Sequence, residues 1–243
     1  MDSFFGVKYE PFYLFSTSHL IAMAVVLVII LSLIPLRMKL TGSVDKVFRY
    51  TLALLLILCE VSYHGWALYN GDWRIAQHLP LQLCSLSILT SSILLLTNNM
   101  KLFPFVYFAG FVGASQAMIT PELEAAFPHY RFYDYFVAHG AIMIAAMYYV
   151  IVKRVRIRLV SLFKTFAFIN VYALFVYIVN VMTGANYMFL MRKPENGNIM
   201  DFLGPHPWYI LSLEAVAFVL CLMAYYPIRR SESLVPFQHS SKL

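Results

Sequence analysis

Long apolar segments alternate with short polar ones along almost the whole chain. Seven apolar segments can be drawn, and each is long enough to cross a hydrocarbon layer of about 30 Å as an α-helix. They cover residues 18–36, 47–69, 79–97, 102–120, 132–152, 159–182 and 208–226. The pattern predicts an all-α fold, a polytopic membrane bundle of seven transmembrane helices.

The composition points to the same class of protein. Hydrophobic residues make up 61% of the chain, charged residues 12%, and the mean hydropathy is +0.71. A chain with so few charged groups cannot cover its apolar surface by folding in water. We therefore expect a multi-pass protein of the cell membrane, with residues 1–228 as a single domain and residues 229–243 as a polar cytoplasmic tail.

The basic residues set the expected orientation, because Lys and Arg in short loops stay on the cytoplasmic side. One side of the predicted bundle holds 13 of the 18 basic residues. These are Arg37, Lys39, Lys46, Arg49, Lys101, Lys153, Arg154, Arg156, Arg158, Lys164, Arg229, Arg230 and Lys242. The amino terminus is therefore expected outside and the carboxyl terminus in the cytoplasm. Loops that face anionic lipid headgroups explain the net charge of +6, so no nucleic-acid partner is expected.

Polar side chains within the apolar segments fall near the outer helix ends. Ionisable groups inside a membrane are costly unless they are paired or face water, so they are functional candidates by default. At about 1.5 Å per residue, most of these groups lie within about 10 Å of the outer end of their helix. The members of this layer are His64, Cys84, Gln116, His139, Asn180 and Glu214. The inner half of the bundle is expected to be nearly devoid of polar groups.

Glu60 and His64 form a second polar feature in the second segment. They are four residues apart, so the carboxylate and the imidazole share one helix face and can pair. Such a pair serves a ligand site or simply holds two helices together.

The segment around Cys84 has two different faces. His78, Gln82 and Ser85 share one face, but Cys84 points about 160° away from Gln82 on a helical wheel. Pro80 suits the first turn of a helix, which places Cys84 near the positive end of the dipole. Cys84 and Gln82 are therefore not expected to face the same pocket.

A thiol near an imidazole is the arrangement for nucleophilic catalysis. The base removes the thiol proton, the sulfur attacks a carbonyl, and the acyl group rests as a thioester before transfer. Cys84 lies near the depth of phospholipid ester carbonyls, although an isolated membrane cysteine is more often a packing residue. His139 is the preferred base. Candidate orienting groups are Glu60, His64 and Glu214, and candidate oxyanion donors are Gln116 and Asn180.

Other motifs limit the chemistry. Cys59, Cys84 and Cys221 all fall inside predicted helices, and no disulfide is expected. The sequence has no paired-cysteine metal motif and no glycine-rich phosphate loop, so neither a metal nor another cofactor is expected. The longest outer loop, residues 183–207, is rich in Gly and Pro, which predicts an ordered, turn-rich lid.

Several short motifs resemble those of a known family. They are Phe15-Ser16-Thr17-Ser18-His19, the run from His78 to Ser85, Gly184-Ala185-Asn186-Tyr187-Met188-Phe189-Leu190, Lys193-Pro194, and Asp201-Phe202-Leu203-Gly204-Pro205 to Tyr209. Together they resemble the YwaF-like family of multi-pass bacterial membrane proteins, which is related to the animal transmembrane protein 164. The resemblance covers nearly the whole chain. It implies transfer of a fatty acyl chain between phospholipids through a cysteine nucleophile, which corresponds to Cys84, with His139 as the histidine of the His-Gly pair.

Two positions depart from the pattern of that family. Gln82 stands where the family often has His, so this side chain cannot act as a base. His206 stands at the centre of a Pro-x-Pro motif where Trp is common, and it adds a titratable group at the mouth of the site. Gln82, His206, His78 and Asn186 are therefore candidate substrate-binding or supporting residues.

Two functions from different classes remain. The first is a lipid acyltransferase or transacylase that uses Cys84 and His139 in an outer-leaflet pocket, with a membrane phospholipid or another acyl lipid as substrate. The concentration of polar side chains in the outer half favours this first function. A transporter also needs a polar path through the inner half, and Asn170 is the only residue that would extend such a path. A scaffold with a packed polar layer is a third alternative. The second function, a proton- or cation-coupled transporter or small-molecule-binding protein, would use Glu60, His64, His139 and Glu214.

Overall fold

The computed structural model describes residues 2–194 and 202–229. The described residues are helical, with no strand beyond isolated bridges, which confirms the all-α expectation. The tail from residue 230 onward and residues 195–201 of the predicted lid lie outside the described residues. The long helices are α2 (Thr17–Leu36), α3 (Gly42–Tyr69), α5 (Leu83–Thr97), α8 (Tyr130–Ile151), α9 (Leu159–Thr183) and α10 (Trp208–Ile228).

Shorter elements connect these helices. Between α5 and α8 the chain forms one broken helical stretch, made of α6 (Phe103–Phe105), the π-helix η1 (Val106–Val112) and α7 (Gly113–Ile119). The other short elements are α1 (Asp2–Phe5), α4 (Ile75–His78) and the 3₁₀ turn η2 (Tyr187–Phe189).

Within the described residues, five helices are long and apolar enough to cross a membrane, namely α2, α3, α8, α9 and α10. Each coincides with one of the predicted segments. The other two predicted segments correspond to shorter apolar helices, α5 and the broken stretch Phe103–Ile119. The 15 residues of α5 give a length of about 22 Å, which is less than a hydrocarbon layer of about 30 Å. The chain is thus a multi-pass helical membrane protein with five candidate spans.

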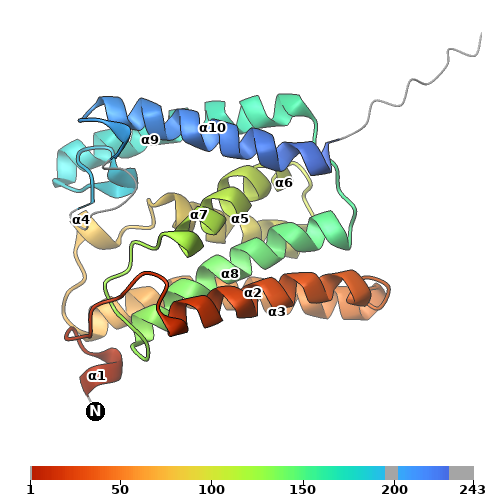
Figure 1. Ribbon diagram of the computed structural model, residues 1–243, viewed down its shortest axis with the longest axis horizontal. Coiled ribbons are helices and arrows are strands. Elements are labelled where there is room, and N and C mark those ends of the chain that lie inside the picture. The colour runs from red at the N-terminus through yellow and green to blue at the C-terminus, as the bar shows by residue number, and fades with distance from the viewer. Residues whose placement is uncertain (1, 195–201, 230–243) are drawn as a thin grey trace, which may run out of the picture.

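The helices are arranged in layers (Figure 1). One outer layer holds α2, α3 and α8, the opposite one holds α9 and α10, and α5, α6 and α7 lie between them. Helix α3 packs on both α5 and α8, α2 packs on α8, and α10 contacts η1. Few residues of α9 and α10 are buried, as expected for helices that face lipid tails.

Glycines allow close approach to helix α8, which packs on α2, α3, α5, α7 and η1. A Cβ at Gly140 would lie 2.6 Å from Cγ2 of Val26 on α2. A Cβ at Gly110 of η1 would lie 3.1 Å from Cγ2 of Ile142 on α8. Lipid tails are as apolar as the helix surfaces, so close van der Waals packing is a main source of association between membrane helices. These two glycines therefore fix how near α2 and η1 come to α8.

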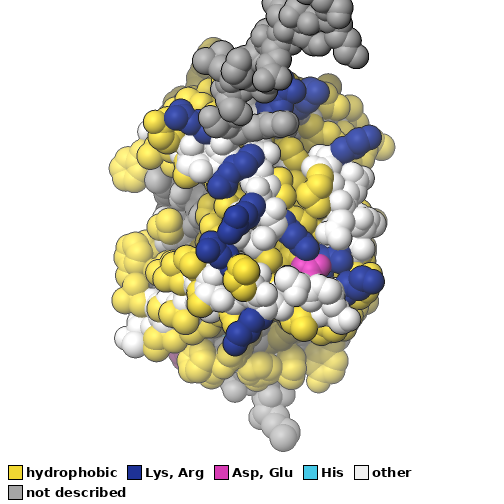
Figure 2. All heavy atoms as spheres, turned by 90° about the vertical axis from the view of Figure 1, so that its right-hand side faces the viewer, with side chains coloured by type: hydrophobic (Ala, Val, Ile, Leu, Met, Phe, Trp, Pro, Cys, Tyr) yellow, Lys and Arg dark blue, Asp and Glu magenta, His cyan; other side chains and the backbone are white. Residues whose placement is uncertain are grey.

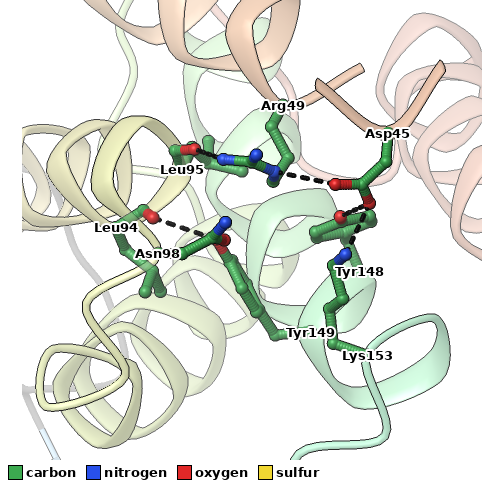
Figure 3. A network of polar contacts seen from close by, with 8 residues as sticks. All are labelled: Asp45, Arg49, Leu94, Leu95, Asn98, Tyr148, Tyr149 and Lys153. Carbon is green, nitrogen blue, oxygen red and sulfur yellow. Dashed lines mark hydrogen bonds and ion pairs between the residues drawn. The ribbon is translucent and has the colours of Figure 1, made fainter. Parts of the chain in front are cut away.

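A buried polar network at the end of the bundle opposite α4 corrects the expectation of an apolar inner half (Figure 3). The carboxylate of Asp45 accepts hydrogen bonds from Arg49 Nε at 3.1 Å, from Lys153 Nζ at 2.7 Å and from the hydroxyl of Tyr148. Asp45 and Arg49 are both buried. Helix α3 begins at Gly42, earlier than the predicted residue 47, so Asp45 belongs to the same helix as Arg49 rather than to a loop. A buried charge needs such partners, because removing one leaves the other uncompensated.

The same network holds the carboxyl-terminal end of α5 (Figure 3). Arg49 donates to the carbonyl of Leu95, and the hydroxyl of Tyr149 lies 2.9 Å from both the carbonyl of Leu94 and Oδ1 of Asn98. The last carbonyls of a helix lack intrahelical partners and carry partial negative charge, which a guanidinium stabilises. The network thus anchors α5 to α3 and α8.

Lysine and arginine side chains gather on this end of the molecule (Figure 2). The helix ends and connections that meet here supply them, whereas acidic side chains are scarce on the face shown. Basic residues of these connections are Arg37, Lys39, Lys46, Lys101, Lys153, Arg154, Arg156, Arg158 and Arg229.

The contact between Gly140 and Val26 predicts a stability effect. Val is stiff at χ1, so Gly140→Ala forces Val26 off its rotamer or moves α2 away from α8, which costs about 1–3 kcal/mol. We expect a lower midpoint of thermal unfolding in detergent micelles. Gly65→Ala is the control, because no atom lies within 4 Å of the added Cβ and Ala favours a helix. Equal midpoints for the two variants would contradict the contact, and Val26→Ala should partly restore Gly140→Ala.

Candidate active site

Cys84 lies at the amino-terminal end of α5. The helix begins at Leu83, with Gln82 as its N-cap, so Cys84 is its second residue, whereas it is the sixth of the predicted segment 79–97. Residues 79–82 are not helical, although Pro80 was expected in the first turn. The first intrahelical hydrogen bond joins the N–H of Leu86 to the carbonyl of Gln82 at 3.1 Å. The N–H groups of Leu83, Cys84 and Ser85 therefore have no partner within the helix.

The structure brings Cys84 and His139 into contact. The Sγ of Cys84 lies 3.2 Å from Nε2 of His139, which is a buried side chain in the middle of α8. The Nδ1 of the same ring lies 2.8 Å from the carbonyl oxygen of Tyr135. A carbonyl only accepts, so this contact assigns the proton to Nδ1 and leaves the lone pair of Nε2 facing the thiol. The Cys84 S–H then donates to Nε2.

Tyr135 holds the imidazole in a second way. Its ring stacks on the ring of His139 with 4.2 Å between centroids, and its hydroxyl donates to the carbonyl of Ala117 on α7 at 3.1 Å. Sequence reasoning missed Tyr135, although its four-residue spacing from His139 was the available signal. Tyr135, rather than one of the predicted carboxylates, orients His139.

Glu60 and His64 do pair, as their spacing indicated. Nε2 of His64 lies 3.6 Å from Oε1 of Glu60, and the indole N–H of Trp73 donates to Nδ1 of His64 at 3.2 Å. Because Nδ1 accepts, the proton of the neutral ring lies on Nε2 and faces the carboxylate. Among the described residues, no hydrogen bond links this pair to His139.

Glu214 lies in a separate contact. Asn170 Nδ2 donates to Glu214 Oε1 at 2.5 Å, which joins α9 to α10. The predicted orienting role for Glu214 at His139 is therefore not supported by its hydrogen bonding. Asn170 was expected only as an extension of a transport path.

The two predicted oxyanion donors are engaged elsewhere. Asn180 uses both amide atoms on Tyr187: its Nδ2 donates to the Tyr187 carbonyl and its Oδ1 accepts from the Tyr187 N–H, each at 2.9 Å. Gln116 Nε2 donates to Thr120 Oγ1 at 2.8 Å within the same stretch. Each amide satisfies polar groups close to it in the sequence. Asn180 bonds to the backbone of the turn after α9, and Gln116 bonds to a hydroxyl at the end of α7.

Three further predicted residues organise the loop after α9. Gln82 Oε1 accepts from the N–H of Met188 at 2.9 Å, so Gln82 faces this loop and not Cys84, although its extended backbone places it outside the helix assumed for the prediction. Asn186 Oδ1 accepts from the N–H of Arg192 at 3.1 Å, and His206 Nε2 lies 3.4 Å from the carbonyl of Leu190.

His78 is buried beside Tyr63, with 5.5 Å between the ring centroids. Its Nδ1 accepts from the N–H of Arg74 at 3.2 Å. Burial is the largest influence on this imidazole and lowers its pKa below the usual range, so the ring is neutral at pH 7. His78 thus supports the short helix α4 rather than acting at the thiol.

An ion pair near the start of α8 was also missed. Arg131 lies 2.5 Å from Asp134, and its guanidinium stacks over the ring of Tyr63 at 4.3 Å. Arg131 precedes the predicted segment 132–152 but lies in α8, and its three-residue spacing from Asp134 was the available signal. Among the described residues, no group of three or more His, Cys, Asp or Glu side chains is placed to hold a metal ion, and all three cysteines are free.

The layered helices and the contact between Cys84 and His139 define a multi-pass membrane protein with a thiol–imidazole pair inside the bundle. The model of the TMEM164 family matches residues 14–225. The chain therefore belongs to the TMEM164 family, which confirms the relationship indicated by its motifs. No curated protein and no solved structure matches the chain.

Proposed function

We propose that this protein transfers a fatty acyl group from a membrane lipid through a thioester on Cys84, with His139 as the general base. The observation that carries the proposal is the 3.2 Å contact between Sγ and Nε2. The Tyr135 carbonyl supports it, because it accepts from Nδ1 at 2.8 Å and so turns the basic nitrogen toward the sulfur. A nucleophile, a base within hydrogen-bond reach and a group that orients the base together make an activated nucleophile.

The first half-reaction breaks an ester bond of the donor lipid. The Cys84 proton moves to Nε2 of His139 as the sulfur attacks the ester carbonyl. Collapse of the tetrahedral intermediate expels the lysolipid alkoxide, which takes the proton back from Nε2. The products are a lysolipid and the acyl thioester of Cys84.

The second half-reaction reverses these roles with a hydroxyl acceptor such as another lysolipid. His139 removes the hydroxyl proton, the oxygen attacks the thioester carbonyl, and the expelled sulfur regains a proton from Nε2. Throughout, the Nδ1–H remains on the Tyr135 carbonyl, which stabilises the transient imidazolium.

The amino-terminal turn of α5 supplies the oxyanion donors in this proposal. The N–H groups of Cys84 and Ser85 have no intrahelical acceptor and lie at the positive end of the helix dipole. Fixed donors next to the nucleophile stabilise the charge that develops on the carbonyl oxygen. They replace Gln116 and Asn180, whose amide groups are bonded to other residues.

The proposed topology places this chemistry in the outer leaflet. We count α5 and the stretch Phe103–Ile119 with the five long helices as seven crossings, with residues 1–228 as one domain of a cell-membrane protein. The basic end (Figure 2) then faces the cytoplasm, and the amino terminus lies outside. If α5 ends at the inner boundary, its length of about 22 Å leaves Cys84 about 9 Å below the outer boundary of the hydrocarbon layer, so the ester group of the donor lipid must enter the bundle to reach the thiol.

A labelling experiment tests this orientation. Lys8→Cys and Lys39→Cys place new thiols on opposite sides of the bundle, both at exposed positions. A membrane-impermeant maleimide should label Lys8→Cys in intact cells and Lys39→Cys only after the cells are permeabilised. The reverse result, or labelling of both in intact cells, would overturn the proposed orientation.

The proposed reaction predicts an acyl-enzyme at one residue. Purified protein is incubated with a phospholipid carrying an isotopically labelled acyl chain, and its peptides are analysed by mass spectrometry. We expect a label at Cys84 that neutral hydroxylamine releases, absent in Cys84→Ala and reduced about 100-fold or more in His139→Ala. Cys59→Ala and Cys221→Ala, which remove the other free thiols, should keep it. Equal labelling of all variants, or acylation of another residue, would reject the mechanism.

The same protein in vesicles addresses the transporter alternative. The four residues predicted for a transporter lie in three separate contacts: Glu60 with His64, His139 with Cys84, and Glu214 with Asn170. Proton or cation flux that is lost in Glu60→Gln, together with the absence of any acyl-enzyme, would favour transport over acyl transfer.

A further inference from the structure

The loop that follows α9 is fastened to the turn that precedes Cys84. We call residues 187–190 the strap. The hydroxyl of Tyr187 accepts from the N–H of Leu79 at 2.8 Å and donates to the carbonyl of Ile75. The N–H of Met188 donates to Gln82, the N-cap residue of α5, at 2.9 Å. Both ends of residues 79–82 are thus bonded to the strap.

The strap itself is held firmly. Tyr187 is only 1% exposed, and its backbone N–H and carbonyl are both bonded to the amide of Asn180. The hydroxyl of Tyr209 donates to the carbonyl of Phe189, which ties the strap to α10. These contacts make the strap a fixed part of the bundle rather than a loose cover.

Two residues of the strap have a costly backbone conformation. Met188 and Phe189 have φ angles of 56° and 53°, in the left-handed region that residues with a side chain rarely adopt. Such conformations cost about 1–3 kcal/mol each and persist only where the surroundings enforce them. Here the bonds from Met188 to Gln82 and from Tyr209 to Phe189 hold both residues.

The turn before Cys84 has an alternative conformation that the strap excludes. The predicted apolar segment begins at residue 79, and Pro80 suits the first turn of a helix. The sequence alone therefore predicts a helix that begins there. In that longer helix the N–H groups of Leu83, Cys84 and Ser85 would bond to the carbonyls of residues 79, 80 and 81. In the structure the carbonyl of Leu81 instead accepts from the hydroxyl of Tyr172 at 3.2 Å.

We propose that the strap, through Tyr187, and the Tyr172 hydroxyl are positioning elements for the proposed acyl transfer, because they stop α5 from extending toward its amino terminus. The inference rests on the proposed function. The strap keeps the N–H groups around Cys84 free to bind an oxyanion, and it keeps the thiol in the first helical turn opposite His139. Without these contacts, α5 would gain a turn and the N–H groups would be consumed within the helix.

The test is the double variant Tyr172→Phe/Tyr187→Phe, which removes the hydroxyl bonds to residues 75, 79 and 81 and leaves the rings in place. Tyr149→Phe is the matched control, because its buried hydroxyl bonds to the Leu94 carbonyl at the opposite end of the same helix (Figure 3). Hydrogen exchange is measured by mass spectrometry on a peptide that covers residues 79–86. We expect slower exchange in the double variant than in the wild type and the control, because three more N–H groups enter helical bonds.

A kinetic measurement accompanies the exchange experiment. We expect kcat for acyl transfer to fall about 100-fold in the double variant, as for loss of an oxyanion donor, with KM little changed. The pH profile of iodoacetamide alkylation at Cys84, read from its peptide, should also shift in the double variant and not in Tyr149→Phe. A merely structural loss would speed exchange in this peptide instead.

The outcomes separate the two proposals. Faster or unchanged exchange of residues 79–86 in the double variant, or kinetics equal to those of Tyr149→Phe, would overturn the role of the strap. Absence of any acyl-enzyme in the wild type would reject the proposed function. In that case slower exchange and a shifted alkylation profile would still support the strap as the element that sets the start of α5.

Discussion

The contact between the Cys84 thiol and the His139 imidazole depends on how buried polar groups are satisfied in this bundle. Within an apolar layer no water is at hand, so each polar group needs a partner supplied by the protein. The Tyr135 carbonyl takes the Nδ1 proton of His139, and this leaves Nε2 as the acceptor for the thiol. Several other polar side chains follow the same rule in separate sets, such as Asn180 with Tyr187 and Glu214 with Asn170.

Both ends of helix α5 are held by such sets of hydrogen bonds. At its carboxyl-terminal end, Arg49 and Tyr149 bond to its last carbonyls, and Asp45 compensates the charge of Arg49 (Figure 3). At its amino-terminal end, the strap and Tyr172 hold the turn before the helix. A helix with a fixed start and a fixed end places its second residue at a defined depth. Cys84 is that residue, which links distant packing to the chemistry proposed at the thiol.

Much of the bundle could be predicted from the sequence, because apolar segments of membrane length leave little choice of secondary structure. The partnership of Cys84 with His139 was also accessible, since both side chains fall at similar depths below the outer helix ends. Gln82 and Cys84 have different partners as expected, although Gln82 precedes the helix on which that expectation was based. The short motifs also indicate the relationship to the TMEM164 family, which the match over residues 14–225 confirms.

Other features depended on contacts between distant segments. The start of α5 was wrong by four residues, because Tyr187 and Tyr172 bond to the turn from more than 90 positions away. The network around Asp45 was missed because Asp45 precedes the predicted segment 47–69, although its four-residue spacing from Arg49 indicated a helical pair. Asn180 was expected to act on a substrate but satisfies the backbone of Tyr187, a role that no local pattern reveals.

The hydrogen bond between Cys84 and His139 is tested most directly by infrared spectroscopy of the S–H stretching band. The difference between wild type and Cys84→Ala isolates this thiol from Cys59 and Cys221. Our account predicts a Cys84 band at lower wavenumber than that of a free thiol, which moves to higher wavenumber in His139→Ala. A Cys84 band at the same wavenumber with and without His139 would contradict the account.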